Sequence, residues 1–129
     1  MQTSRLMQNI LALVAVVFGL VTIVSGSRVL LGADPGYIVF QPLLLFNTAM
    51  GFIYVGAGVA AWRNLARGRT TAGAIFALNL VVLAATAALY SSGDSVAIES
   101  VRAMTLRTVV WLALFAGFAW LMRASAVRR

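Results

Sequence analysis

Long apolar runs, separated by short segments rich in polar, glycine or proline residues, dominate this chain of 129 residues. A helix needs about 20 consecutive apolar residues to cross the hydrocarbon core of a bilayer. Runs of that kind predict membrane-spanning helices over about 7–26, 37–62, 70–90 and 103–122. The chain is therefore expected to be all-α, an integral membrane four-helix bundle forming a single membrane domain over residues 1–129.

Turn-forming segments separate the predicted spans. "GADPGY" (32–37) places Pro35 and Gly36 where a tight turn needs a fixed φ followed by a positive φ. "RNLARGR" (63–69) is expected to be a short basic link, and "SSGD" (91–94) ends the third span. The second and third spans should consequently run as an antiparallel hairpin.

The composition supports a membrane protein. Hydrophobic residues make up 62% of the chain and charged residues 10%, with a mean hydropathy of +0.97. Water-soluble domains carry about 25% charged residues. So few charges could not cover the surface of a protein in water, which excludes the soluble classes.

All the basic residues behind the net charge of +7 are arginines. The charged residues are distributed unequally between the two sides of the predicted membrane. Seven arginines and no acid fall on one side: Arg5, Arg63, Arg67, Arg69, Arg123, Arg128 and Arg129. The other side is balanced: Arg28, Arg102 and Arg107 against Asp34, Asp94 and Glu99. The positive-inside rule then predicts that both termini are cytoplasmic, N-in and C-in, and that the basic charge serves topology rather than nucleic-acid binding.

The arginine-only, alanine- and valine-rich usage is typical of a high-GC bacterial genome, so the expected location is the bacterial inner membrane. The first run has an alternative interpretation as a secretory signal peptide, with Arg5 before it and Ser25, Gly26 and Ser27 after it. Because the run is longer than a usual signal core and its removal would leave three spans, we expect it to be retained.

Small residues are spaced by three or four along the predicted helices and should form their contact faces, because lipid gives helices no hydrophobic reason to associate. The first span carries Ala15, Gly19, Thr22 and Gly26; the second Gly51, Gly58 and Ala61; the fourth Ala113 and Gly117.

Polar residues form a stripe on two spans. Asn47 and Tyr54 share one face of the second span, and Asn79, Thr86 and Tyr90 share one face of the third. In an antiparallel hairpin Tyr54 lies near the depth of Asn79, and Asn47 near that of Thr86, so the stripes should face each other and exchange hydrogen bonds. They serve either as structural links, at about 0.6 kcal/mol per bond, or as the lining of a polar pocket toward the outer face.

Charges gather where the fourth span begins, in "GDSVAIESVRAMTLRTVVW" (93–111). Glu99 and Arg102 are i and i+3 neighbours, and Arg107 lies about two turns deeper than Glu99, where it either snorkels outward or joins Asp34. Glu99 shares its stripe with small residues, so it is expected to face the bundle interior. That stripe continues through Leu106, Val110, Ala113 and Gly117.

The outer cluster of Asp34, Glu99, Arg102 and Arg107 has two main interpretations. One is an ion-pair network that caps the fourth helix. The other is a clamp for an anion or a lipid headgroup, in which Arg102 and Arg107 bind and Glu99 orients them. Proton coupling by Glu99 is a third, less favoured because no second acid lies within the spans.

Catalytic chemistry has few candidates. The chain has no cysteine and no histidine, and its lack of lysine excludes a Schiff base. Gly56 and Gly58 make a Gly-x-Gly inside an apolar helix, without the strand and turn of a nucleotide site. No catalytic constellation, metal site or cofactor is therefore expected, and we predict that the protein is not an enzyme.

The layout of four spans in about 130 residues resembles small bacterial four-helix membrane families, the DoxX-like proteins among them. "QPLLLFNTAMGFIYVGAG" (41–58) and "ESVRAMTLRTVVW" (99–111) resemble motifs of an uncharacterised family of this kind. Small multidrug exporters share the size, but they rely on a membrane-embedded glutamate in the first span, where this chain has none.

We therefore expect a non-catalytic inner-membrane protein: an accessory or assembly subunit, or a module that binds a small ligand or lipid. The alternative is a small transporter or channel-forming oligomer that uses the Asn/Thr/Tyr stripe as its path. The expected partners are the lipid bilayer and either a membrane protein or further copies of this chain, with no nucleic acid.

Overall fold

The computed structural model describes residues 2–36, 38–93 and 96–127, and the side chains of 5–36, 38–93 and 96–124. It confirms the all-α fold, and no strand occurs in these residues. The described residues form four helices: α1 (Gln2–Leu30), α2 (Gln41–Arg63), α3 (Leu65–Ser91) and α4 (Ile98–Val127). Each is long and apolar enough to cross a membrane.

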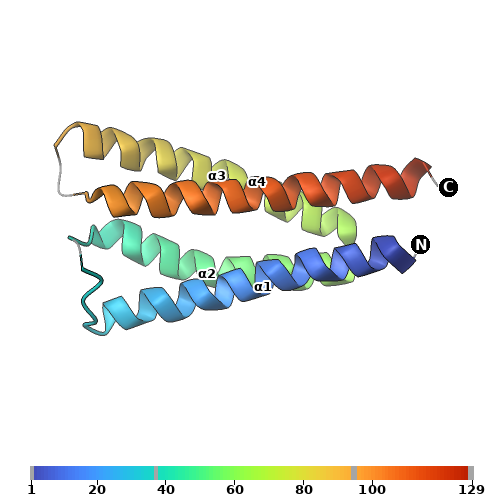
Figure 1. Ribbon diagram of the computed structural model, residues 1–129, viewed down its shortest axis with the longest axis horizontal. Coiled ribbons are helices and arrows are strands. Elements are labelled where there is room, and N and C mark those ends of the chain that lie inside the picture. The colour runs from blue at the N-terminus through green and yellow to red at the C-terminus, as the bar shows by residue number, and fades with distance from the viewer. Residues whose placement is uncertain (1, 37, 94–95, 128–129) are drawn as a thin grey trace.

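The helices run antiparallel to their neighbours in an elongated bundle (Figure 1). The two chain ends and the α2–α3 link lie at one end, which we call the terminal end. The segments that follow α1 and α3 lie at the opposite end, which we call the loop end. Helix α1 packs extensively on α2, and α3 on α4, whereas contacts between these two pairs are sparser. The bundle therefore consists of two tightly packed helix pairs, α1 with α2 and α3 with α4.

The segment between α1 and α2 turns as its sequence predicts. Gly36 has a φ of +87°, and its N–H donates to Asp34 Oδ1 at 2.8 Å. Helix α2 begins at Gln41, with Pro42 in its first turn, where a fixed φ and a missing N–H are no disadvantage. The predicted start at residue 37 is therefore four residues too early.

The α2–α3 link is a single residue, Asn64, and the predicted basic link over 63–69 is wrong. Its N–H donates to Ala60 O at 2.8 Å, which closes α2. Its Oδ1 accepts from Arg67 N at 3.2 Å, which caps α3. Because asparagine ends one helix and starts the next, the arginines after it remain helical.

A side chain of α1 completes the end of α2. Gln8 is buried, and its Nε2 donates to the carbonyl oxygen of Ala61 at 2.7 Å. Carbonyl groups in the last turn of a helix have no partner within the helix. Gln8 therefore ties α1 to the terminal end of α2, a contact that the sequence pattern does not indicate.

Small residues hold α1 against α2, as predicted. Gly19, Gly51 and Gly58 are buried between the two helices. A Cβ built on Gly51 would lie 3.1 Å from Gly19 O, and one on Gly58 would lie 2.9 Å from Ala12 O. The two backbones are thus too close for larger side chains, the packing that membrane helices use in place of hydrophobic association.

Helix α4 buries a different face from the predicted one. Leu106 is 59% exposed and Ala113 is also exposed. The buried face carries large side chains instead: Met104, Trp111, Leu114, Phe118 and Leu121. Contacts between the two helix pairs are sparser than those between α1 and α2, and the large side chains of α4 are the buried ones, so the small-residue stripe of α4 is not its main contact face.

Large apolar side chains cover the outer surface of all four helices. Among the exposed ones are Leu13, Val17, Leu20, Val21, Val24, Phe52, Ile53, Val59, Leu78, Leu80, Val81, Val109 and Leu112. Soluble proteins rarely expose continuous apolar surface of this extent. Together with the lengths of the helices, this surface indicates a membrane protein.

The α1–α2 packing predicts opposite effects for two glycines of α2. Gly58→Ala should destabilise the bundle by about 1–3 kcal/mol, because the new methyl group meets the backbone of Ala12. Gly56→Ala should be neutral or stabilising, because nothing lies within 4 Å of its Cβ position. Unfolding by sodium dodecyl sulfate in mixed micelles measures both, and equal effects would contradict the close α1–α2 contact.

Candidate functional site

A polar pair lies in the centre of the bundle. Tyr54 of α2 and Asn79 of α3 are both 0% exposed. The Tyr54 hydroxyl donates to Asn79 Oδ1 at 3.3 Å, and Asn79 Nδ2 donates to the same hydroxyl oxygen at 3.1 Å. The predicted hydrogen bonding between the stripes of the second and third spans is thus confirmed for this pair, which connects the two helix pairs.

Aromatic rings surround this hydrogen bond. The ring of Tyr54 lies 4.9 Å from that of Trp111 and 5.6 Å from that of Phe18, measured between centroids, and both contacts are tilted. Phe18, Tyr54, Asn79 and Trp111 therefore bring one residue from each helix into a central layer. Tilted rings at these distances add favourable quadrupole interactions to the packing.

The remaining members of the predicted stripe do not join this pair. Thr86 is buried, but its hydroxyl donates to Val82 O of its own helix at 2.7 Å. Tyr90 is 44% exposed. Asn47 is half-buried, and its Oδ1 is a buried atom with no hydrogen-bond partner. The Thr86 hydroxyl therefore does not donate to Asn47 Oδ1, the partner that was expected for it.

Asn47 instead borders a pocket of about 220 Å³ at the loop end, between α1, α2 and α4. The apolar part of its lining includes Pro35, Val39, Phe40, Leu43 and Leu44. The polar lining residues are Thr22, Ser25, Asn47, Ser100 and Arg107. We call this space the loop-end pocket.

The pocket arises from the spacing of small residues on α4. Ser100, Ala103 and Arg107 share one face at i, i+3 and i+7 and line the same wall. Because the first two are small, α4 does not fill the gap to α1 and α2 at this level. At 1.5 Å per residue, Arg107 lies about 14 Å below the start of α4 at Ile98.

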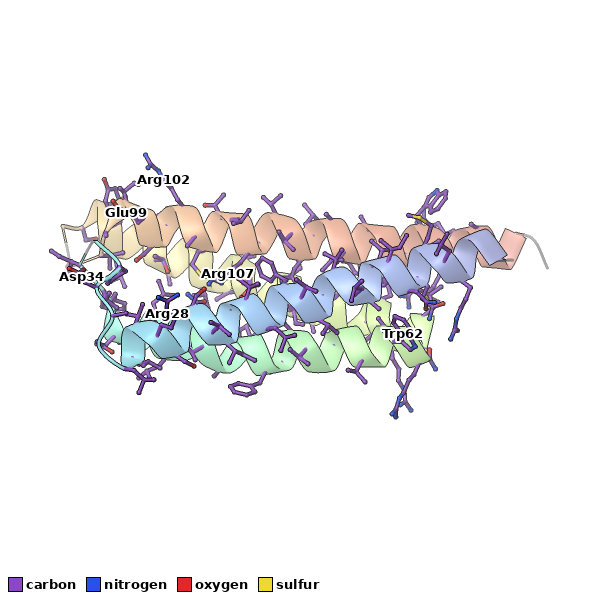
Figure 2. All side chains as sticks on the ribbon, turned by 60° about the horizontal axis from the view of Figure 1, so that its bottom comes forward. Arg28, Asp34, Trp62, Glu99, Arg102 and Arg107 are labelled. Carbon is purple, nitrogen blue, oxygen red and sulfur yellow. The ribbon has the colours of Figure 1, made fainter. Side chains whose placement is uncertain are left out.

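The residues of the predicted outer cluster lie in two settings: Asp34, Glu99 and Arg102 are exposed at the loop end, and Arg107 is half-buried. Asp34 binds Gly36 within its own loop, and Glu99 and Arg102 are both exposed. Figure 2 shows Arg102 pointing away from the bundle, whereas Arg107 lies between α4 and α1. Of the four residues in the cluster, Arg107 alone lines the loop-end pocket.

The expectation that Glu99 faces inward is wrong, because its neighbour Ser100 occupies the buried position of that turn. Glu99 lies in the first turn of α4, where a carboxylate favours the positive end of the helix dipole and contact with water. Asp94, Arg128 and Arg129 lie outside the described residues. The alternative in which Arg107 joins Asp34 stays a prediction; the carboxylate of Asp34 accepts from Gly36 N.

Sequence reasoning assigned Asn47 and Arg107 to separate groups, and the structure puts them on one pocket. The spacing of Ser100, Ala103 and Arg107 was the available signal, but it gains meaning only once the buried face of α4 is known. No group of three histidine, cysteine or acidic residues that could hold a metal ion occurs among the described residues.

Comparison with protein-family models, curated proteins and solved structures finds no match to this chain.

Proposed function

We propose that the protein is an integral protein of the bacterial inner membrane, with both termini in the cytoplasm. The exposed arginines support this orientation. Five described ones lie at the terminal end, where no described acid occurs: Arg5, Arg63, Arg67, Arg69 and Arg123. The described acids, Asp34 and Glu99, lie at the loop end with Arg28 and Arg102 (Figure 2). The positive-inside rule makes the terminal end cytoplasmic.

Within that membrane the protein is proposed to act as a non-catalytic module that binds a small ligand or a lipid headgroup. One observation carries this proposal: the loop-end pocket combines Arg107, its only charged lining residue among those described, with Asn47, whose buried Oδ1 has no hydrogen-bond partner. An acceptor oxygen buried without a donor costs free energy that a bound donor would recover.

The two side chains define the chemistry of the ligand. A guanidinium donates charge-assisted hydrogen bonds to a phosphate or carboxylate, and an amide oxygen accepts from a hydroxyl or amine. The ligand is therefore an oxyanion with a hydroxyl or amine close to it. Glycerol phosphate has this chemistry, both as a free molecule and as part of a phospholipid headgroup.

Binding fits the interior better than transport does. The polar stripe ends at Tyr54 and Asn79, and beyond them toward the terminal end the buried side chains are mainly apolar, including Ala57, Phe118 and Leu121. The buried polar side chain there, Gln8, donates to the Ala61 carbonyl oxygen and so closes the end of α2. A transport path would need polar groups through that half. An accessory or assembly subunit would need no pocket, which is why a ligand-binding module is favoured.

The orientation predicts the behaviour of reporter fusions. Alkaline phosphatase, which is active only after export, should be active when fused after Gly93 at the loop end. The matched fusion after Arg67, at the terminal end, should be inactive. Activity of the two fusions on agar indicator plates tests this, and the reverse pattern would overturn the proposed orientation.

The pocket predicts that glycerol phosphate stabilises the protein through Arg107. Either sn-glycerol 3-phosphate in solution or phosphatidylglycerol in mixed micelles should raise the unfolding temperature of the wild-type protein. Arg107→Gln should abolish the shift produced by sn-glycerol 3-phosphate and reduce the shift produced by phosphatidylglycerol, and Asn47→Leu should reduce both. A response to the free compound that needs Arg107 identifies a soluble ligand, and a response to the lipid alone that Arg107→Gln reduces identifies a headgroup.

Arg102→Gln is the matched control, because it removes the same charge from the same helix at an exposed position outside the pocket. It should retain the full thermal shift. An equal loss in Arg102→Gln and Arg107→Gln, or a wild-type protein that responds to neither compound, would contradict ligand binding in the loop-end pocket.

A further inference from the structure

A second hollow lies at the terminal end, between the start of α3 and the end of α4. It has a volume of about 640 Å³. Its lining residues are Arg69 and Thr70 on α3, and Phe115, Ala119, Met122 and Arg123 on α4. We call it the α3–α4 groove. Two exposed arginines thus flank a surface that is otherwise mainly apolar.

The charged and the apolar residues that line the groove lie at different heights along α4. Phe115 precedes Arg123 by eight residues, so it lies about 12 Å further from the terminal end. Its ring packs against α3 at Gly73, where an added Cβ would lie 2.9 Å from Phe115 Cε1. The groove is therefore charged toward the end of the bundle and apolar toward its middle.

Two tryptophans mark the level of the arginines relative to a bilayer. Trp62 precedes Arg63, the last residue of α2, and Trp120 precedes Arg123 by less than one turn; both tryptophan side chains are exposed. Figure 2 shows Trp62 at the terminal end of the bundle. Because amphipathic indoles prefer the headgroup region, Arg69 and Arg123 lie at the level of lipid phosphates.

We propose that the α3–α4 groove binds one anionic glycerophospholipid of the cytoplasmic leaflet. Arg69 and Arg123 hold the phosphate, Thr70 adds a hydroxyl, and an acyl chain lies along Met122, Ala119 and Phe115. The described acids lie at the other end of the bundle, so no described carboxylate competes for these arginines. Basic pockets between membrane helices on the cytoplasmic side bind anionic headgroups in this way.

The apolar half of the groove favours a lipid over a soluble anion, since inorganic phosphate would leave Phe115, Ala119 and Met122 without a ligand contact. The site is independent of the loop-end pocket, because the two share no residue and lie at opposite ends of the helices. Binding at either site can therefore fail alone, whereas the assignment of the lipid to the cytoplasmic leaflet rests on the proposed orientation.

Native mass spectrometry of the purified full-length protein tests the proposal. Phosphatidylglycerol and phosphatidylcholine with identical acyl chains are titrated in a neutral detergent. The wild-type protein should bind the first lipid about tenfold more tightly than the second. Arg69→Gln/Arg123→Gln should lose this preference. Ala119→Phe keeps both arginines but fills the apolar half, so it should weaken the binding of phosphatidylglycerol.

Arg5→Gln/Arg63→Gln is the matched control, because it removes two exposed arginines from the same end outside the groove. It should keep the preference, and so should Arg107→Gln, whose change lies in the other pocket. Circular dichroism and gel filtration confirm that each variant is folded. An equal loss in both double variants, no preference in the wild-type protein, or equal competition by inorganic phosphate would overturn the proposal.

Discussion

The hydrogen-bonded pair of Tyr54 and Asn79 is the contact on which the arrangement of the bundle depends. Lipid offers helices no hydrophobic reason to associate, so close packing and hydrogen bonds must hold them together. Glycines supply close packing between α1 and α2. Between the two helix pairs contacts are sparser, and there this fully buried pair joins α2 to α3, in contact with the ring of Trp111.

The same division into pairs explains where the bundle is hollow. At the central layer, large side chains fill the gap between the pairs. Toward the loop end, α4 presents Ser100 and Ala103, and the gap remains open as the loop-end pocket with Arg107 in its wall. A single constraint, two tight pairs joined at their middle, thus gives both a filled centre and a polar pocket at one end.

The sequence predicted what depends on composition and local spacing: the helices, the glycine face of α1 and α2, and the Tyr54–Asn79 contact. It failed for α4, where small residues were taken to mark the buried face. Small residues are buried where backbones meet, as between α1 and α2, whereas the buried face of α4 carries large side chains such as Met104 and Trp111. The inward orientation of Glu99 was wrong for the same reason, and the pocket depends on relative helix positions that no single stripe reveals.

A double-mutant cycle on Tyr54→Phe and Asn79→Leu, followed by unfolding in mixed micelles, tests the central claim most directly. The account predicts that the two changes are not additive, with a coupling free energy between about 0.6 and 1.7 kcal/mol, the average and upper values for bonds between membrane helices. Tyr90→Phe combined with Asn79→Leu should be additive, because Tyr90 makes no contact with Asn79. Additive effects of Tyr54→Phe and Asn79→Leu would contradict the claim that their hydrogen bond joins the two helix pairs.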